Sequence, residues 1–421
     1  MSPTSQRNPW QPPRLRSIET DSERHASWLE LFFDLVFVVA VSELSHYLST
    51  HISLQGFLIF VGLFLPIWWS WIGATFYATR FDTDDLGHRL LTLLQIAAVA
   101  ALAVNVYEAT GATAVGFALA YATVRLITIA EYIRVWLSVE QARPLARIYV
   151  RGFSLAMSLW VISVFVPPPQ RFILWGMAMV VDFLTPLVDR RLITRIPVDV
   201  SHATERMGLF TIIVLGEAVL GAVRGVSEQE WNWLSALIAF LGLSIAFSFW
   251  WIYFDSMDNS PLQAAKAGDA KTGFVWLYIH LALVIGLAGT GVGVEKIVAG
   301  SMAGSLDSSA RWVLGGSVVI CLLAMAVLHG VTASLAERHR KMLSLYRLLA
   351  VAFALVMTSL PLPPLVFMGL IAATCLVQVG LELLRSHQLE PEQRAMLASG
   401  SGLLLDTDRP EDHPHPPDPR A

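Results

Sequence analysis

The chain has 421 residues, of which 55% are hydrophobic and 15% are charged, and its mean hydropathy is +0.58. Such values lie outside the range of soluble proteins and exclude an ordinary water-soluble globular chain. The net charge of −4 carries little information by itself, and we expect the lipid bilayer, with no nucleic acid, as the partner of this protein.

A helix needs about 20 mostly apolar residues to cross the hydrocarbon core of a membrane. Runs of this kind, bracketed by polar or turn-forming residues, recur along most of the chain. They predict an all-α integral membrane protein of about twelve transmembrane helices. In chain order the expected spans are 28–49, 53–77, 89–108, 112–134, 148–166, 171–188, 206–224, 231–254, 273–295, 311–330, 343–360 and 364–384.

The positions of Lys and Arg predict the orientation of these spans. If the N-terminus is cytoplasmic, 24 of these residues fall on the inner side, four on the outer side and one within a span. Cytoplasmic loops carry an excess of positive charge, so this split predicts that both termini are cytoplasmic. The polar segments 1–25 and 386–421 are expected to be disordered.

The two halves of the chain resemble each other, which suggests a six-helix half at 26–195 and a second at 196–385. Six spans per half would leave two copies in the same orientation, related by an axis along the membrane normal. Aligning the first span with the seventh pairs Leu35 with Leu209, Val39 with Ile213 and Glu43 with Glu217.

Four ionisable residues lie deep within predicted spans: Asp34, Arg125, Asp182 and Glu217. A charge at such depth costs several kcal/mol unless it is paired or hydrated. One interpretation is that Arg125 bridges Asp34 and Asp182, while Glu217 and then Glu43 continue a path outward for protons or cations. The other interpretation is a structural lock, in which Arg125 only allows two acidic helices to pack.

Other side chains within the spans have ordinary structural explanations. A single histidine such as His280 usually bonds a backbone carbonyl, although a titration-linked role stays open. Trp68, Trp69 and Trp71 are expected in an aromatic belt at the membrane interface. Gly216 belongs to a small-residue face suited to close helix contact.

Nucleotide, metal and nucleophile motifs are missing from the sequence. It has no Gly-rich loop with a phosphate-binding Lys, no His-Glu-x-x-His and no nucleophile elbow. Cys321 and Cys375 both lie in apolar runs and are expected to be packing residues. We therefore assign no catalytic residue, no metal ligand and no cofactor, and we favour a function other than catalysis.

Three stretches resemble the motifs of the bacterial low temperature requirement protein A family. They are Glu30-Leu31-Phe32-Phe33-Asp34-Leu35-Val36-Phe37-Val38, then His202 with Glu205-Arg206-Met207-Gly208-Leu209 and Val214-Leu215-Gly216-Glu217, and finally Trp250-Trp251-Ile252-Tyr253-Phe254-Asp255. The resemblance covers roughly residues 20–385. It implies a multi-pass membrane protein linked to growth at low temperature, and it supplies no mechanism. The polar motif residues it points to are Glu30, Asp34, His202, Glu205, Arg206, Glu217 and Asp255.

Three functions stay open at this level. The first is a secondary transporter or ion-conducting protein of the cell membrane, in which Asp34 and Glu217 carry a cation or proton. The second is an intramembrane or lipid-modifying enzyme, which requires His202, Glu205 and Asp255 to meet in a cavity near the inner surface. The third is a structural role in the membrane or in cold adaptation, without transport.

Overall fold

The computed structural model covers the whole chain and describes residues 10–15, 27–82, 85–189, 196, 198–228, 232–256, 260–300, 306–331 and 337–388. Within these ranges the protein has thirteen α-helices, two short 3-10 turns and one pair of two-residue strands. Ten of the described helices are long and apolar enough to cross a membrane. The predicted all-α, multi-pass membrane architecture is therefore confirmed.

Twelve of the helices have 15 residues or more and match the twelve expected spans in order. The additional helix, α10 (Ser260–Lys266), was not expected from the sequence. The helices α1 and α6 are not among the ten candidate spans, so the count of twelve crossings stays a prediction. The long helices are α1 Trp28–Thr50, α2 Leu54–Ala78, α3 Leu86–Val106, α4 Ala114–Ser138, α5 Arg143–Ser163, α6 Gln170–Leu184, α8 Val200–Ser227, α9 Trp233–Ser256, α11 Ala270–Ala299, α12 Ser308–Val331, α13 Glu337–Ser359 and α14 Pro364–Gln388.

Polar residues cap the N-terminal ends of several helices. The first N–H groups of a helix have no partner within it, and a side-chain oxygen at the preceding residue can accept from them. Ser27 caps α1 in this way, Asn232 and Asp307 cap α9 and α12, and four further helices begin with a similar cap. The other capping residues are Ser53 of α2, Asp85 of α3, Asp199 of α8 and Asp269 of α11.

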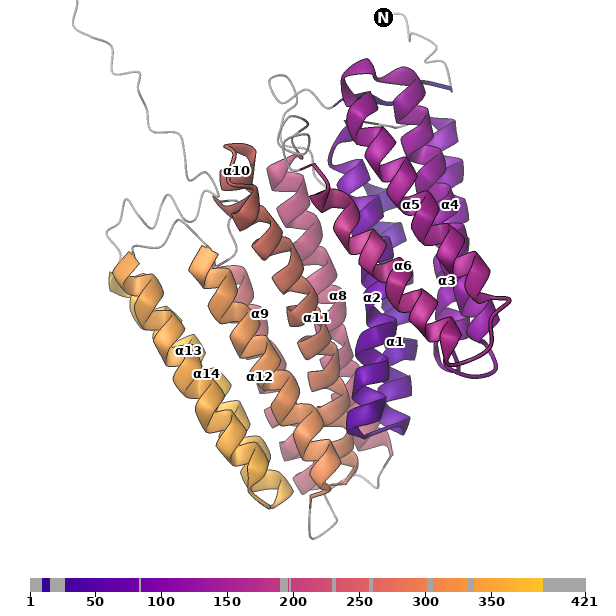
Figure 1. Cartoon of the computed structure of the whole chain (residues 1–421). Coiled ribbons are helices and arrows are strands. Elements are labelled where there is room, and N and C mark those ends of the chain that lie inside the picture. Colours follow the sequence, from indigo (N-terminus) through magenta and orange to yellow (C-terminus); the bar gives the residue numbers. More distant parts are fainter. Residues whose placement is uncertain are drawn as a thin grey trace, which may run out of the picture.

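The helices of the two halves have the same order of neighbours. In the first half α1 packs against α2 and α3, and α3, α4, α5 and α6 then follow side by side. In the second half α8 packs against α9 and α11, followed in the same way by α12, α13 and α14. Figure 1 shows the first half in indigo to magenta beside the second, with α8 and α11 next to α1. The halves differ in one respect, because α9 also packs against α14 whereas α2 has little contact with α6, and the two six-helix repeats stay a prediction.

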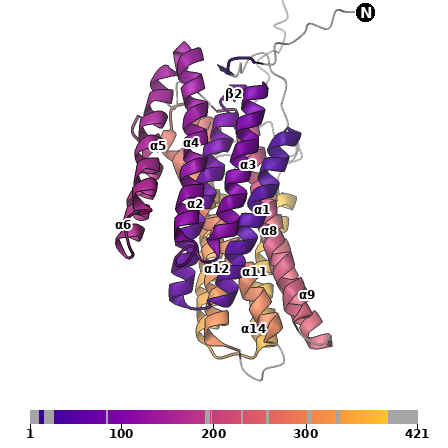
Figure 2. The ribbon, with the colours of Figure 1, turned by 90° about the vertical axis from the view of Figure 1, so that its right-hand side faces the viewer.

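One end of the bundle carries the short elements. Strand β1 (Arg14–Leu15) pairs antiparallel with β2 (Phe81–Asp82), and β2 and α10 both lie at the upper end in Figures 1 and 2. We expected all of 1–25 to be disordered, but residues 10–15 are described and β1 is paired with β2. The rest of that segment and 389–421 lie outside the described residues.

The expected belt of tryptophans on α2 was wrong. Trp68, Trp69 and Trp71 are all 3% exposed or less. Trp69 lies against Phe183 of α6, with 4.4 Å between ring centroids, and Trp71 lies at the same distance from Phe210 of α8. These rings fill the bundle interior because α2 is enclosed by neighbouring helices.

The glycines that permit close helix contact lie one to two turns beyond Gly216. A Cβ atom at Gly216 would meet nothing within 4 Å, so the close contact expected there was wrong. At Gly221 the same atom would lie 2.2 Å from the carbonyl oxygen of Gly291 on α11. The contact between α8 and α11 therefore depends on Gly221 and Gly291.

Candidate functional site

The polar centre of the protein lies between α1 and α8. Glu30 and Asp34 are one turn apart on α1, and His202 and Arg206 are one turn apart on α8. Glu30 bonds His202 and Asp34 bonds Arg206, and both pairs are separated by 172 residues. Two contacts with the same separation mean that α1 and α8 run parallel and in register, with an acid facing a base at each level.

Asp34 is the most enclosed acid of this centre, with 1% of the residue exposed. Its Oδ1 atom accepts from Arg206 Nη2 at 2.5 Å and from Trp71 Nε1 at 2.7 Å. Its Oδ2 atom has no hydrogen-bond partner among the described residues, and the same is true of Arg206 Nε and His202 Nδ1. Buried polar atoms without partners are uncommon and mark places where water or a ligand binds.

Glu30 links the start of α1 to α8. Its Oε2 atom accepts from the backbone N–H of Ser27 at 2.7 Å, which completes a capping box with the Ser27 hydroxyl. Its Oε1 atom lies 3.1 Å from His202 Nε2 and 3.4 Å from Arg206 Nη1. Arg206 therefore reaches both carboxylates, Glu30 and Asp34, from one position.

A cavity of about 430 Å³ opens beside this centre, among α1, α2, α3 and α4 at the end of the bundle that carries β2. Its wall includes Glu30 and Arg206, as well as Tyr77, Gln95 and Thr92. The Tyr77 hydroxyl and the Gln95 Nε2 atom are buried without a partner among the described side chains. A cavity of this size, with polar groups in part of its wall, has room for several water molecules or a small solute.

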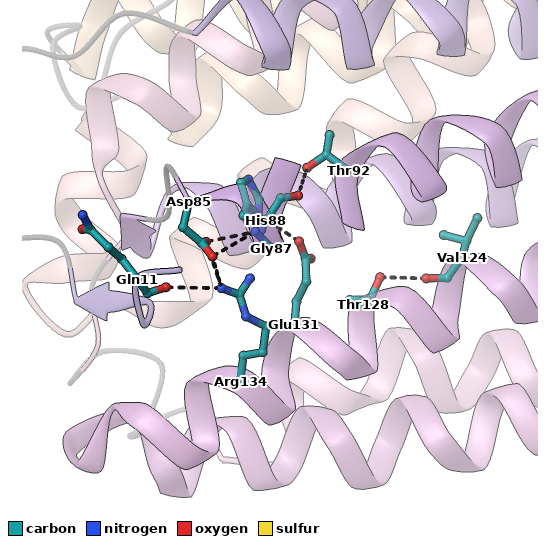
Figure 3. Close-up of polar contacts among 9 residues, drawn as sticks. All are labelled: Gln11, Asp85, Gly87, His88, Thr92, Val124, Thr128, Glu131 and Arg134. Carbon is teal, nitrogen blue, oxygen red and sulfur yellow. Dashed lines mark hydrogen bonds and ion pairs between the residues drawn. The ribbon is translucent and has the colours of Figure 1, made fainter. Parts of the chain in front are cut away.

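Two ion pairs hold the α3 and α4 wall of the cavity, as Figure 3 shows. His88 Nδ1 lies 3.1 Å from Glu131 Oε1. Asp85 accepts from Arg134 Nη2 at 2.7 and 2.8 Å, and that same nitrogen donates to the Gln11 carbonyl at 3.4 Å. The residues before β1 are thereby tied to the cavity wall.

The Asp85 carboxyl lies at the start of α3, outside the apolar part of the bundle. Burial disfavours its charged form, but the hydrogen bonds and charge of Arg134 outweigh this and lower the pKa of Asp85. Backbone N–H groups of His88 and Gly87 act in the same direction. Asp85 therefore stays ionised and keeps Arg134 in place at neutral pH.

Arg125 does not bridge Asp34 and Asp182, which corrects the expected network. Arg125 Nε lies 3.0 Å from Asp182 Oδ2, and the Tyr121 hydroxyl donates to the same oxygen at 2.5 Å. Arg125 also packs on the rings of Tyr121 and Phe153, each 4.8 Å from its guanidinium carbon. Asp34 forms its pair with Arg206 instead, because α8 presents a closer guanidinium.

The outer acids are separate from this centre. Glu217 is 3% exposed and lies three turns beyond Arg206 on α8. Two turns further on, Arg224 donates to Ser42 of α1 at 3.0 Å. Glu217 Oε1 has no hydrogen-bond partner among the described side chains. Glu43 is exposed on the outer half of α1 and does not face Glu217.

The residues required by the enzyme hypothesis do not line either described cavity. His202 faces Glu30, Glu205 is half-buried, and Asp255 is exposed near the end of α9. His280 accepts from, or donates to, the Tyr253 hydroxyl at 3.1 Å and bonds the Trp276 carbonyl at 2.6 Å. The bond to the Trp276 carbonyl is the one expected for a structural histidine, and the titration-linked role of His280 stays open. Among the described residues no three His, Cys, Asp or Glu side chains are grouped to hold a metal ion.

A second buried charge cluster in the C-terminal half was missed from the sequence. Arg347 of α13 lies 2.6 Å from Glu382 of α14, and His329 of α12 lies 3.3 Å from the same oxygen. All three side chains are 1% exposed. Glu382 lies within the expected span 364–384. An acid within an apolar span needs a partner, as Asp182 does, so the sequence already indicated this cluster.

One family model matches most of this chain. The family model described as bacterial low temperature requirement A protein matches residues 25–380. The chain belongs to this family. A protein of Rhizobium meliloti (strain 1021), itself described as uncharacterized, is 30% identical over 297 residues, which cover 67% of this chain and 71% of the relative. No solved structure matches the chain.

Two of the three stretches that resemble the low temperature requirement A motifs meet in this site. The first contributes Glu30 and Asp34 from α1, and the second contributes His202 and Arg206 from α8. The third stretch ends α9, where Tyr253 contacts His280 of α11 and Thr211 of α8. This chain therefore brings together four polar side chains that membrane burial alone makes costly.

Proposed function

We propose that this low temperature requirement A family member is a secondary transporter or ion-conducting protein of the cell membrane, which carries a proton or small cation by way of Asp34. The observation that carries the proposal is the position of Asp34. It is buried next to a partly polar cavity, its Arg206 partner lines that cavity, and its second oxygen is unpaired among the described residues.

Arg206 acts in this proposal as a displaceable counter-ion. A proton or cation on Asp34 would neutralise the carboxylate and weaken its contact with Arg206. The guanidinium already lies 3.4 Å from Glu30, so it can shift its charge pairing there without leaving the site. Binding at Asp34 would in this way bias the contact between α1 and α8, and with it the two halves.

The route toward Glu217 is closed in this conformation. Between the levels of Asp34 and Glu217, α1 and α8 bury the apolar side chains of Phe37, Val41, Phe210 and Val214. A site open to one side and closed by an apolar segment toward the other is what alternating access between two halves requires. Glu217 and Arg224 would form the outer station of the route.

Ion flux in proteoliposomes tests this function. The purified chain would be reconstituted with a pH-sensitive dye inside the vesicles and challenged with proton, sodium and potassium gradients. We expect flux with the intact protein and with Glu43→Gln, which changes an exposed acid. We expect loss of flux with Asp34→Asn and with Glu217→Gln, in protein that elutes as a folded species. Folded wild-type protein without flux under every gradient would favour the enzyme or the structural role.

The Arg125–Asp182 pair fits a structural role better than a step on this route. Both side chains are 0% exposed, and neither lines the cavity beside Asp34. The Arg347–Glu382 pair has the same character in the second half. Each half thus holds its last helix, α6 or α14, through one buried carboxylate, and we assign both pairs to helix packing.

A further inference from the structure

Arg80 is a buried arginine without an acidic partner among the described side chains. It follows α2 directly, it is 3% exposed, and it forms no ion pair with any side chain that the structure describes. Its Nη1 atom donates to the Phe76 carbonyl at 3.5 Å, a long contact, and its Nε atom has no hydrogen-bond partner. An isolated buried charge is among the costliest features that a protein can keep.

The described side chains around Arg80 are aromatic and uncharged. Its guanidinium carbon lies 5.5 Å from the ring centroid of Phe76 and 6.0 Å from that of Tyr149. The Tyr132 phenol is a further neutral contact. Cation–π contacts offset part of the cost of burial, but they supply no negative charge.

Arg80 also lines a second cavity, which is separate from the cavity beside Asp34 and has a volume of about 90 Å³. The rest of its wall is apolar and runs along α2 as far as Trp69, about 16 Å from Arg80 at the helical rise per residue. Phe274 and Leu277 of α11 form the opposite wall. The short helix α10 covers the inner-side end through Leu262 and Ala265.

A basic residue at the inner end of a span usually serves only to set orientation. In that role a long side chain extends to the headgroup region, where water and lipid phosphates solvate it. Arg80 does not do so, because it is enclosed, whereas Arg143 at the same side of the bundle has a side chain that is 46% exposed. The enclosed position of Arg80 therefore requires another explanation.

We propose that the cavity between α2, α10 and α11 binds an anionic lipid of the inner leaflet, with the lipid oxyanion on Arg80 and part of its hydrocarbon chain along Phe76 and Trp69. The guanidinium supplies two or more N–H donors to a phosphate or carboxylate, which is the recognition that arginine favours. The cavity is larger than one water molecule and smaller than the ~150 Å³ cavity that admits benzene. It therefore accommodates a segment of a hydrocarbon chain rather than a whole lipid.

The site joins the two halves of the protein. α2 belongs to the first half, and α10 and α11 belong to the second. A lipid held there would stabilise the contact between the halves at the inner side. This inference does not depend on transport, because it concerns a different cavity and a binding reaction.

Lipid binding to the purified full-length chain tests the proposal. Native mass spectrometry and thermal unfolding in detergent would be recorded with phosphatidylglycerol, phosphatidylcholine or inorganic phosphate added. We expect bound phosphatidylglycerol and a raised unfolding temperature with that lipid alone. In Arg80→Gln the affinity for phosphatidylglycerol should fall about tenfold or more, whereas Arg143→Gln, the exposed control, should bind like the wild type.

The lipid-free stability of Arg80→Gln separates a binding residue from a structural one. Because Arg80 has no acidic partner, lipid-free Arg80→Gln should unfold at or above the wild-type temperature, and a structural arginine would lower it. Ala270→Phe, which fills the cavity and keeps Arg80, should also lose phosphatidylglycerol binding. Equal binding by Arg80→Gln and Arg143→Gln, or equal stabilisation by inorganic phosphate and the lipid, would overturn the proposal.

Discussion

Asp34 on α1 and Arg206 on α8 lie 172 residues apart in the sequence, and 2.5 Å separates Asp34 Oδ1 from Arg206 Nη2. Glu30 and His202 meet with the same separation one turn nearer the inner end. These two contacts set the relative height of the first helix of each half. Glu30 and Arg206 line the cavity beside this centre, and each is bonded to one of the other two side chains, His202 and Asp34.

Asp34→Asn should lower the thermal stability of the protein markedly. Removal of one partner of a buried ion pair leaves the other charge uncompensated, which costs about 3–5 kcal/mol. Combining Asp34→Asn with Arg206→Gln should cost less than the sum of the two single changes. Thermal unfolding in detergent measures this, with Glu43→Gln as a control that leaves the temperature unchanged. Additive losses would contradict a direct pair.

The double variant Arg125→Met with Asp182→Leu should fold and retain ion flux. Arg125→Met alone leaves the Asp182 charge buried and should destabilise the protein by about 3–5 kcal/mol, whereas apolar residues at both positions restore much of that loss. Unfolding temperatures and the proteoliposome assay would be recorded on the same preparations. A stable double variant that carries no ions would show that this pair belongs to the route after all.

Gly221→Ala should destabilise the contact between α8 and α11, because its new Cβ atom would lie 2.2 Å from a backbone oxygen that cannot rotate away. Overpacking of this kind costs about 1–3 kcal/mol. Gly216→Ala on the same helix is the matched control, since its Cβ atom enters open space. The difference in unfolding temperature is the measurement, and equal effects of the two changes would refute this account of the contact.

The stabilising effect of Asp85 should depend on pH. Its pKa is lower in the folded protein than in the unfolded chain, so its contribution is present above the unfolded pKa and is lost as pH falls through the folded value. At neutral pH, Asp85→Asn should cost about 1.5–3 kcal/mol through the lost charged hydrogen bonds. The difference in unfolding temperature should shrink below about pH 4. A difference independent of pH would contradict the contact with Arg134.

Hydropathy and charge placement predicted the helices well, because a membrane permits few backbone structures other than helices. The expected span 28–49 corresponds to α1 at Trp28–Thr50, and the span 364–384 to α14 at Pro364–Gln388. Helix α10 was missed because seven residues are too few to register as a span.

The partners of the buried charges could not be predicted from depth alone. Asp34, Arg125 and Asp182 were placed at similar depths, which suggested one network, but depth does not say which side of a helix faces which neighbour. The structure turns Arg125 toward Tyr121 and Asp182, and it turns Asp34 toward α8. Arg206 is the first residue of the expected span 206–224, a position that suggests contact with water, although it is 1% exposed and completes the central pair.

The most direct test of the central claim is the accessibility of the cavity beside Asp34. Thr92→Cys places a thiol in the cavity wall, and the native Cys321 and Cys375 are fully buried. A membrane-impermeant thiol reagent should label Thr92→Cys from the cytoplasmic face only, while Thr50→Cys, at the exposed opposite end of α1, should be labelled from the outer face. Labelling of Thr92→Cys from the outer face, or from neither face, would contradict an inner cavity that leads to Asp34.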